Sequence, residues 1–114
     1  MNFHSFTQRG MGVLNLVEQV RTQAFKQPEK IAYHFKGKDT SYGEFEFQVG
    51  RFAFALQQMG VQKGDHVALL LANTPHYLIS LYATMRIGAV AIPINPTYTP
   101  DEISYIIRNG DVKV

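Results

Sequence analysis

The chain has 114 residues, 46% of them hydrophobic, which is enough for one hydrophobic core but not for two. Eleven basic and nine acidic residues give a formal charge of +2, and these charges are spread singly along the chain. Without a basic run or stripe, nucleic-acid binding is not predicted. The absence of cysteine excludes a disulfide framework and a thiolate metal site, and it fits a reducing cytoplasm.

Neither the first residues nor the longest apolar tract predicts a secretory signal or a membrane span. The first ten residues hold one arginine and no sustained apolar run, and Met11–Val17 is interrupted by an asparagine. The longest apolar tract, Leu78–Ile94, is divided by Arg86, Gly88 and Pro93, so it predicts a helix and a strand rather than a transmembrane segment. We therefore expect a soluble, cytoplasmic protein.

The first predicted elements are a helix and a small hairpin that follow a loose lead-in over residues 1–12. Apolar residues three or four apart predict an amphipathic helix that ends before Pro28. Alternating apolar side chains predict a strand over residues 31–35, and Lys36-Gly37 can form a tight turn into Asp39–Ser41. The apolar positions of the predicted amphipathic helix are Val13, Leu16, Val17, Val20 and Ala24.

A long helix is predicted from Tyr42 to Met59. Ser41 and Glu44 have the spacing of a capping box, in which both side chains bond to backbone N–H groups of the first turn, and Gly60 ends the helix. One apolar stripe along it is expected to face the core. Its members are Tyr42, Phe45, Val49, Phe52, Leu56 and Met59.

A second stripe lies almost opposite the first on the same helix. It consists of Gly43, Phe47, Gly50 and Phe54, so two faces of the helix suit close packing. Two interpretations remain open: the phenylalanines contact a partner, or they are simply exposed, as single surface apolar residues often are.

The central stretch, Gly60–Tyr98, predicts a right-handed βαβ crossover between parallel strands. Residues 66–72 are almost all apolar without alternation, as in a strand covered on both faces. Residues 89–94 form the second strand, which Pro93 brings toward its end because proline has no N–H to donate. The helix between them is expected to begin at Asn73 or Thr74, each a suitable cap, with Pro75 in its first turn, and to end with Arg86 and Gly88.

The last predicted helix begins with the capping box Thr99-Pro100-Asp101-Glu102 and runs to Arg108, before Asn109-Gly110. Residues 111–114 then begin another strand. An apolar strand at the very end of the chain, without a covering helix after it, predicts an incomplete domain. The predicted fold class is α/β: a partial three-layer parallel sheet with covering helices and a small N-terminal hairpin.

Motifs that would carry chemistry are not found. In Gly60-Val61-Gln62-Lys63-Gly64-Asp65 the lysine precedes the second glycine and a strand follows, so a cap and turn are predicted instead of a phosphate loop. Glu44 and Glu46 point in different directions on their helix, and Glu44 has a capping role, so they are not predicted to act as an acid–base pair. Asp101 and Glu102 are explained by their capping positions in the same way. No Gly-x-Ser-x-Gly elbow occurs. The histidines lack metal-ligand spacing; they are His4, His34, His66 and His76.

Three blocks of sequence, in this order and spacing, resemble the opening of the AMP-forming acyl-CoA synthetases. They are Thr40-Ser41-Tyr42-Gly43-Glu44-Phe45, Gly60–Ala68, and Ile87-Gly88-Ala89-Val90-Ala91-Ile92-Pro93-Ile94-Asn95-Pro96. Gln27–Ala32 and Glu102–Ile106 extend the match, so that it covers about residues 13–114. Within the family the chain looks most similar to a bacterial long-chain fatty-acid–CoA ligase.

The resemblance implies a two-step reaction in the parent enzyme. A fatty-acid carboxylate attacks ATP to give an acyl-adenylate and pyrophosphate, and the thiol of coenzyme A then displaces AMP. The family uses ATP, Mg²⁺ and CoA, held by a Ser/Thr/Gly-rich phosphate loop, by later nucleotide contacts and by a lysine in a mobile C-terminal domain. Those motifs do not occur in residues 1–114, so no catalytic, cofactor-binding or metal-binding residue is assigned. Residues 13–114 are expected to be the first part of the large N-terminal domain, truncated before the phosphate loop, and inactive with no cofactor bound.

Two other functions are compatible with the residues. The chain could be a self-contained interaction module that uses the helix over residues 42–59, or form a homo-oligomer through the exposed edge of its last strand. It could also be a small nucleotide-binding domain, which only the sheet topology supports. The acyl chain length is not predicted.

Overall fold

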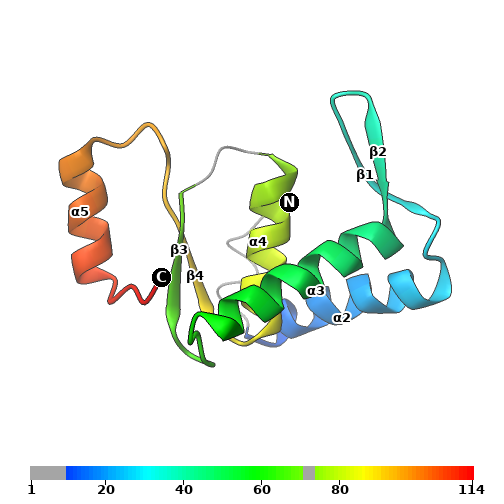
Figure 1. Ribbon diagram of the computed structural model, residues 1–114, viewed down its shortest axis with the longest axis horizontal. Helices are drawn as coiled ribbons and strands as arrows, with labels where there is room; N and C mark the ends of the chain where they lie inside the picture. The colour runs from blue at the N-terminus through cyan, green and yellow to red at the C-terminus, as the bar shows by residue number, and fades with distance from the viewer. Residues whose placement is uncertain (1–9, 71–73) are drawn as a thin grey trace. The chain divides into compact units, whose positions relative to one another are not determined.

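The computed structural model describes residues 10–70 and 74–114, and within the first helix it describes the side chains from residue 16 onward. Residues 10–12 of the predicted lead-in belong instead to the first helix, which begins at Gly10. Residues 1–9, Leu71, Ala72 and the proposed cap Asn73 lie outside the described residues. The chain forms two compact units that divide within helix α3, the first ending at Gln48 and the second running from Val49 to Val114. Figure 1 shows the elements of both units.

The first unit contains α2 (Gly10–Lys26), the hairpin strands β1 (Ile31–Phe35) and β2 (Lys38–Ser41), and the start of α3 (Tyr42–Gln58). β1 and β2 pair antiparallel with a bulge between Ile31 and Tyr33. The predicted turn is confirmed, because Lys36 and Gly37 have φ of 50° and 79°, the left-handed pair that a two-residue hairpin needs.

The start of α3 is held by local contacts that the sequence predicts. The Ser41 hydroxyl accepts the Glu44 N–H at 3.2 Å. The Glu44 carboxylate, however, accepts from the Gln48 side chain at 3.5 Å. Gly43 donates its N–H to the Pro28 carbonyl at 2.9 Å, and a Cβ there would lie 3.1 Å from that oxygen. The close packing predicted for Gly43 is therefore confirmed.

The predicted core stripe of α3 is partly wrong. Phe45, Val49 and Leu56 are buried, but Phe52 is 37% exposed and Met59, which lies after the last helical residue, is 59% exposed. Ala53 is buried in place of Phe52, because the buried positions of the helix follow one another at four, four and three residues, through Phe45, Val49, Ala53 and Leu56. Phe47 and Phe54 are 64% and 63% exposed, which both interpretations of the second stripe require, so the choice between them stays open.

The second unit is built on the parallel strands β3 (His66–Leu69) and β4 (Val90–Pro93), which confirms the predicted pairing. His66 lies opposite Val90 and Leu69 opposite Pro93. Both strands are shorter than predicted, since β3 ends before Leu70 and β4 starts after Ala89. Val67 and Leu69 are buried while His66 and Ala68 are half-buried, so the two faces of β3 are not covered equally.

Helix α4 (Pro75–Arg86) connects the two strands. Thr74 is its N-cap and Pro75 its first residue, as predicted, but among the described residues the Thr74 side chain makes no capping hydrogen bond. Gly88 has φ of 76°, the left-handed conformation that ends the helix. The helix buries every residue from Ile79 to Thr84.

Helix α5 (Pro100–Asn109) follows, and residues after it return to the sheet. Val112 bridges His66 in parallel, on the edge of β3 opposite β4, which confirms that a strand begins near the predicted position. In Figure 1, α4 and α5 lie on opposite sides of β3 and β4, so the second unit has three layers. Of the helices in the described residues, none is long and apolar enough to cross a membrane.

Candidate functional site

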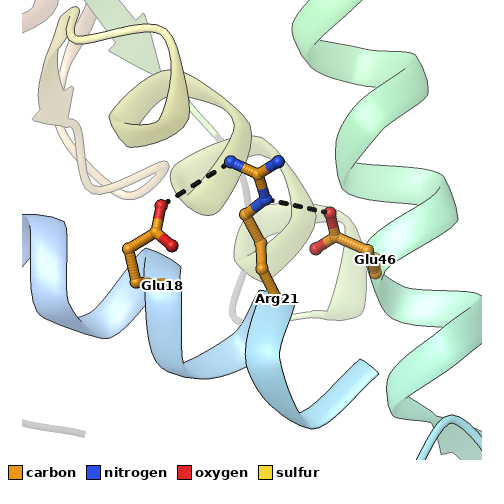
Figure 2. Close-up of polar contacts among 3 residues, drawn as sticks. All are labelled: Glu18, Arg21 and Glu46. Atoms are coloured by element: carbon orange, nitrogen blue, oxygen red, sulfur yellow. Dashed lines mark ion pairs between the residues drawn. The ribbon is translucent and has the colours of Figure 1, made fainter. Parts of the chain in front are cut away.

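The polar cluster drawn in Figure 2 joins α2 to the start of α3. Arg21 Nη1 lies 3.6 Å from Glu18 Oε1, and Arg21 Nε lies 3.9 Å from Glu46 Oε1. The Arg21 and Glu18 side chains are more than half exposed, so water screens this pair strongly. Two carboxylates already offset the charge of Arg21, and the cluster is therefore unsuited to holding a phosphate group.

The loop between α3 and β3 forms a turn, as the sequence indicates, and not a phosphate cradle. Asp65 Oδ2 accepts the Gln62 N–H at 2.8 Å, and Gly64 donates its N–H to the Gly88 carbonyl at 2.9 Å. A Cβ on Gly88 would lie 3.0 Å from the Lys63 stem. These polar groups of the loop thus bond within its own turn and to the residue that ends α4.

The described histidines lie apart and have structural surroundings. His34 pairs with Asp39 across the hairpin, and His76 is exposed on α4. The Nδ1 of His66 bonds to the Gly110 carbonyl, a contact that joins β3 to the end of α5. His4 lies outside the described residues. Across residues 10–70 and 74–114, no group of three histidine or carboxylate side chains could hold a metal ion.

The carboxyl ends of β3 and β4 form the edge at which open α/β sheets bind ligands. Asn95 follows β4, and its Oδ1 accepts from the Thr97 N–H at 2.9 Å and from the Thr97 hydroxyl at 2.8 Å. Thr74, the N-cap of α4, follows β3. These groups are uncharged, so they could orient a ligand but could not act as a general base or stabilise a phosphate by charge.

The side chain of Tyr77 has a shifted pKa. Burial raises the pKa of the Tyr77 phenol above the ordinary tyrosine value, because the phenolate would lose hydration. Tyr77 lies in the first turn of α4. It is kept in its neutral form, which can donate a hydrogen bond but cannot serve as a base near neutral pH.

That no residue of the chain has a catalytic, cofactor-binding or metal-binding role stays a prediction. Sequence reasoning did miss the link between His66 and Gly110. The two residues are 44 positions apart, and no local pattern connects them. Only the knowledge that residues 112–114 return beside β3 would have indicated this contact.

The chain matches the family described as AMP-binding enzyme over residues 20–114. It is 36% identical to a long-chain-fatty-acid–CoA ligase of Bacillus subtilis over 91 residues, which are 80% of this chain and 16% of that relative. It is 34% identical to a long-chain-fatty-acid–CoA ligase of Yersinia pestis over 97 residues, which are 84% of this chain and 17% of that relative. The chain thus spans less than a fifth of the length of these curated relatives.

Solved structures agree with the family match. The N-terminal domain of FACL13 from Mycobacterium tuberculosis superposes with a TM-score of 0.80 at 31% identity, covering 86% of this chain and 25% of that domain. The N-terminal subdomain of NpsA from Klebsiella oxytoca, solved with 3-hydroxyanthranilyl-AMSN, gives a TM-score of 0.79 at 26% identity, covering 85% of this chain and 25% of that one. With the family match over residues 20–114, these likenesses show that the chain belongs to the AMP-binding enzyme family.

Proposed function

We propose that this chain is the opening part of the N-terminal domain of a long-chain fatty-acid–CoA ligase, and that it serves as scaffold there. The observation that carries the proposal is the parallel β3–β4 pair around α4, in a chain that superposes on the FACL13 N-terminal domain at a TM-score of 0.80. The complete enzyme would convert a fatty acid, ATP and CoA into acyl-CoA, AMP and pyrophosphate, with Mg²⁺ as its metal and in the cytoplasm.

The described residues fit a scaffold better than a catalytic surface. In the ionic cluster two carboxylates outweigh the charge of Arg21, and no cluster of three histidine or carboxylate side chains among the described residues could hold a metal ion. We therefore assign no residue of this chain to ATP, Mg²⁺ or CoA, and we expect the chain alone to be inactive. Its contribution would be the buried face of β3 and the buried helix α4, on which later parts of the domain can build.

A fatty acid is proposed as the substrate because two of the relatives are long-chain fatty-acid–CoA ligases. Two long-chain ligases are 36% and 34% identical to the chain, whereas a 3-oxocholest-4-en-26-oate–CoA ligase of Rhodococcus rhodochrous is 30% identical. This margin is small, and the identities alone do not separate fatty acids from other carboxylic acids. The test must therefore measure activity with several acids.

A segment exchange tests the proposal. The matched segment of the Bacillus subtilis ligase would be replaced by the corresponding residues of this chain, and acyl-CoA formation measured with palmitate, acetate and benzoate. We expect activity that is highest with palmitate. The matched control carries the corresponding Yersinia pestis segment. A folded chimera that is inactive with all three acids, while the control is active, would contradict the proposal.

A second candidate function is a self-contained interaction module. It is favoured by Phe47 and Phe54, which lie seven residues apart on α3 and are both mostly exposed. The edge of the terminal strand could also pair with a second copy. Sedimentation of the pure chain across a wide concentration range tests both ideas. If the chain associates and Phe54→Ser weakens the association, the exposed phenylalanines of α3 form the interface. A monomer at every concentration would exclude self-association.

A further inference from the structure

Residues 99–114, which we call the strap, are attached to the second unit in an unusual way. They comprise the N-cap of α5, α5 itself and the segment that bridges to β3. Although the structure describes every residue of α5, none of them is buried, and Tyr105 and Ile107 are 66% and 42% exposed. An element with few buried contacts opens at a low free-energy cost.

The attachments of the strap are concentrated at one edge of β3. Lys113 donates its N–H to the His66 carbonyl at 2.8 Å, and Ala68 donates its N–H to the Val114 carbonyl at 2.8 Å. The His66 side chain adds a third hydrogen bond, from Nδ1 to the Gly110 carbonyl. His66 therefore bonds the strap through its backbone and through its ring.

A fourth contact is apolar and small. A Cβ placed on Gly110 would lie 3.2 Å from Ile92 Cδ1, so the end of α5 touches β4 closely. On its other side the strap is connected through the turn at Asn95, in which Tyr98 donates its N–H to the Asn95 carbonyl at 3.0 Å. The strap is thus joined to β4 through this turn, and the hydrogen bonds that hold it lie on the edge of β3 that does not pair with β4.

We propose that the strap opens from β3 as one unit and that the His66 side chain is the latch that holds it closed. Detached, a helix of ten residues is too short to be stable in water, so α5 unfolds as the strap opens. The open state exposes the Ala68 N–H and the His66 carbonyl, which can then pair with another strand. This inference does not depend on the ligase activity proposed above.

Native-state hydrogen exchange of the full chain, followed by NMR, tests the cooperative opening. The reporter amides are Lys113 and Ala68 at the strap edge and Ile103 within α5, which bonds to the Thr99 carbonyl at 3.0 Å. The reference amides are Val90 and Ile94, which bond to the Asp65 and Leu69 carbonyls on the opposite edge of β3. We expect the reporters to share one protection factor, lower than that of the references. Equal protection in both sets would overturn the proposal.

The latch is tested with two variants of His66. His66→Ala removes the donor and should lower the protection of Lys113 and Ile103 about fivefold, the effect of one net hydrogen bond. His66→Asn keeps an N–H donor near the position of Nδ1 and should retain most of the protection. His76→Ala, at an exposed histidine of α4, is the matched control and should change nothing.

The outcomes separate a latch from a general stabilising role. Equal losses in His66→Ala and His66→Asn would overturn the latch, because the donor would then be irrelevant. A parallel fall in the protection of Val90 and Ile94 would also overturn it, because His66 would then stabilise the whole sheet. If His66→Ala does not fold, His66→Phe, which keeps a ring without a donor, replaces it and should show the same loss confined to the strap.

Discussion

Helices α4 and α5 begin alike and are stabilised differently. Each has a threonine N-cap followed by proline. In α5 the Thr99 hydroxyl accepts the Glu102 N–H at 3.2 Å, and Asp101 and Glu102 both lie in the first turn. In α4 the first turn has no acidic residue, and the Thr74 side chain makes no capping bond within the described residues. Yet α4 is the buried helix, so strong signals at a helix end do not indicate that the helix is central to the core.

The burial of α4 includes polar residues, and the helix itself satisfies them. Ser80 and Thr84 are 2% and 0% exposed. The Ser80 hydroxyl donates to the His76 carbonyl and the Thr84 hydroxyl to the Ser80 carbonyl, each at 2.7 Å. Because these bonds lie within the helix, α4 can pack on all sides without leaving an unpaired hydroxyl.

The largest difference between the two helices should appear when an apolar side chain is truncated. Leu81→Ala in α4 removes a side chain that is 4% exposed and should lower the free energy of unfolding by about 2–5 kcal/mol. Ile107→Ala in α5, where the side chain is 42% exposed, should cost less than about 1 kcal/mol. Urea denaturation followed by circular dichroism measures both, and equal losses would remove the distinction between the helices.

The glycines that end the two helices should respond to substitution for different reasons. Gly88 has φ of 76°, so Gly88→Ala should cost about 1–2 kcal/mol of stability, the strain of a left-handed alanine. Asparagine tolerates this conformation, and Gly88→Asn should cost less. Gly110 has φ of −85°, but a Cβ there would meet the Ile106 carbonyl at 2.7 Å.

A larger residue at Gly110 is therefore disfavoured by a steric clash and not by the backbone conformation. Gly110→Asn should destabilise the protein at least as much as Gly110→Ala, since both add the same Cβ. Thermal denaturation of the four glycine variants provides the comparison. If asparagine were better tolerated than alanine at both positions, the assignment of different causes would be wrong.

The capping threonines offer a smaller effect. Thr99→Ala loses an acceptor for the Glu102 N–H and should destabilise α5 by about 1 kcal/mol. Thr74→Ala, which loses no such bond among the described contacts, should leave the stability almost unchanged. The cost at Thr99 should be seen as faster amide exchange within α5, with little change in the urea midpoint. A larger cost at Thr74 than at Thr99 would contradict the observed hydrogen bonds.

The smallest effect concerns the pH dependence of α4. Folding raises the pKa of Tyr77, so its contribution to stability is fully present below the pKa of an unfolded tyrosine, about 10. That contribution is lost as the pH rises through the higher pKa of the folded state. Absorbance of tyrosinate during alkaline titration should show a late component that Tyr77→Phe removes. A titration curve that Tyr77→Phe changes only in amplitude, without loss of the late component, would contradict this.

The sequence predicts the parts of the fold that depend on neighbouring residues. The Lys36-Gly37 turn, the Ser41 and Thr99 caps and the left-handed Gly88 are all confirmed, because each is decided within a few positions. The parallel pairing of β3 with β4 was also predictable, since two short apolar strands around one helix have few other arrangements.

The errors concern contacts between distant segments. The apolar stripe of α3 includes Phe52 and Met59 by spacing, but the neighbouring elements decide the rotation of the helix, and Ala53 is buried in place of Phe52. The bond between His66 and Gly110 depends on a strand that returns from the end of the chain. For the candidate site, residue patterns alone indicate no chemistry, and the order of three sequence blocks predicted the family that the residue 20–114 match confirms.

The most direct test of the central claim, that this chain is scaffold without the reacting groups, is ATP–pyrophosphate exchange by the purified chain. Labelled pyrophosphate would be supplied with Mg-ATP, with and without palmitate. We predict no incorporation into ATP above the protein-free level, while the intact Bacillus subtilis ligase incorporates label under the same conditions. Palmitate-dependent incorporation that copurifies with the 114-residue chain would contradict the claim.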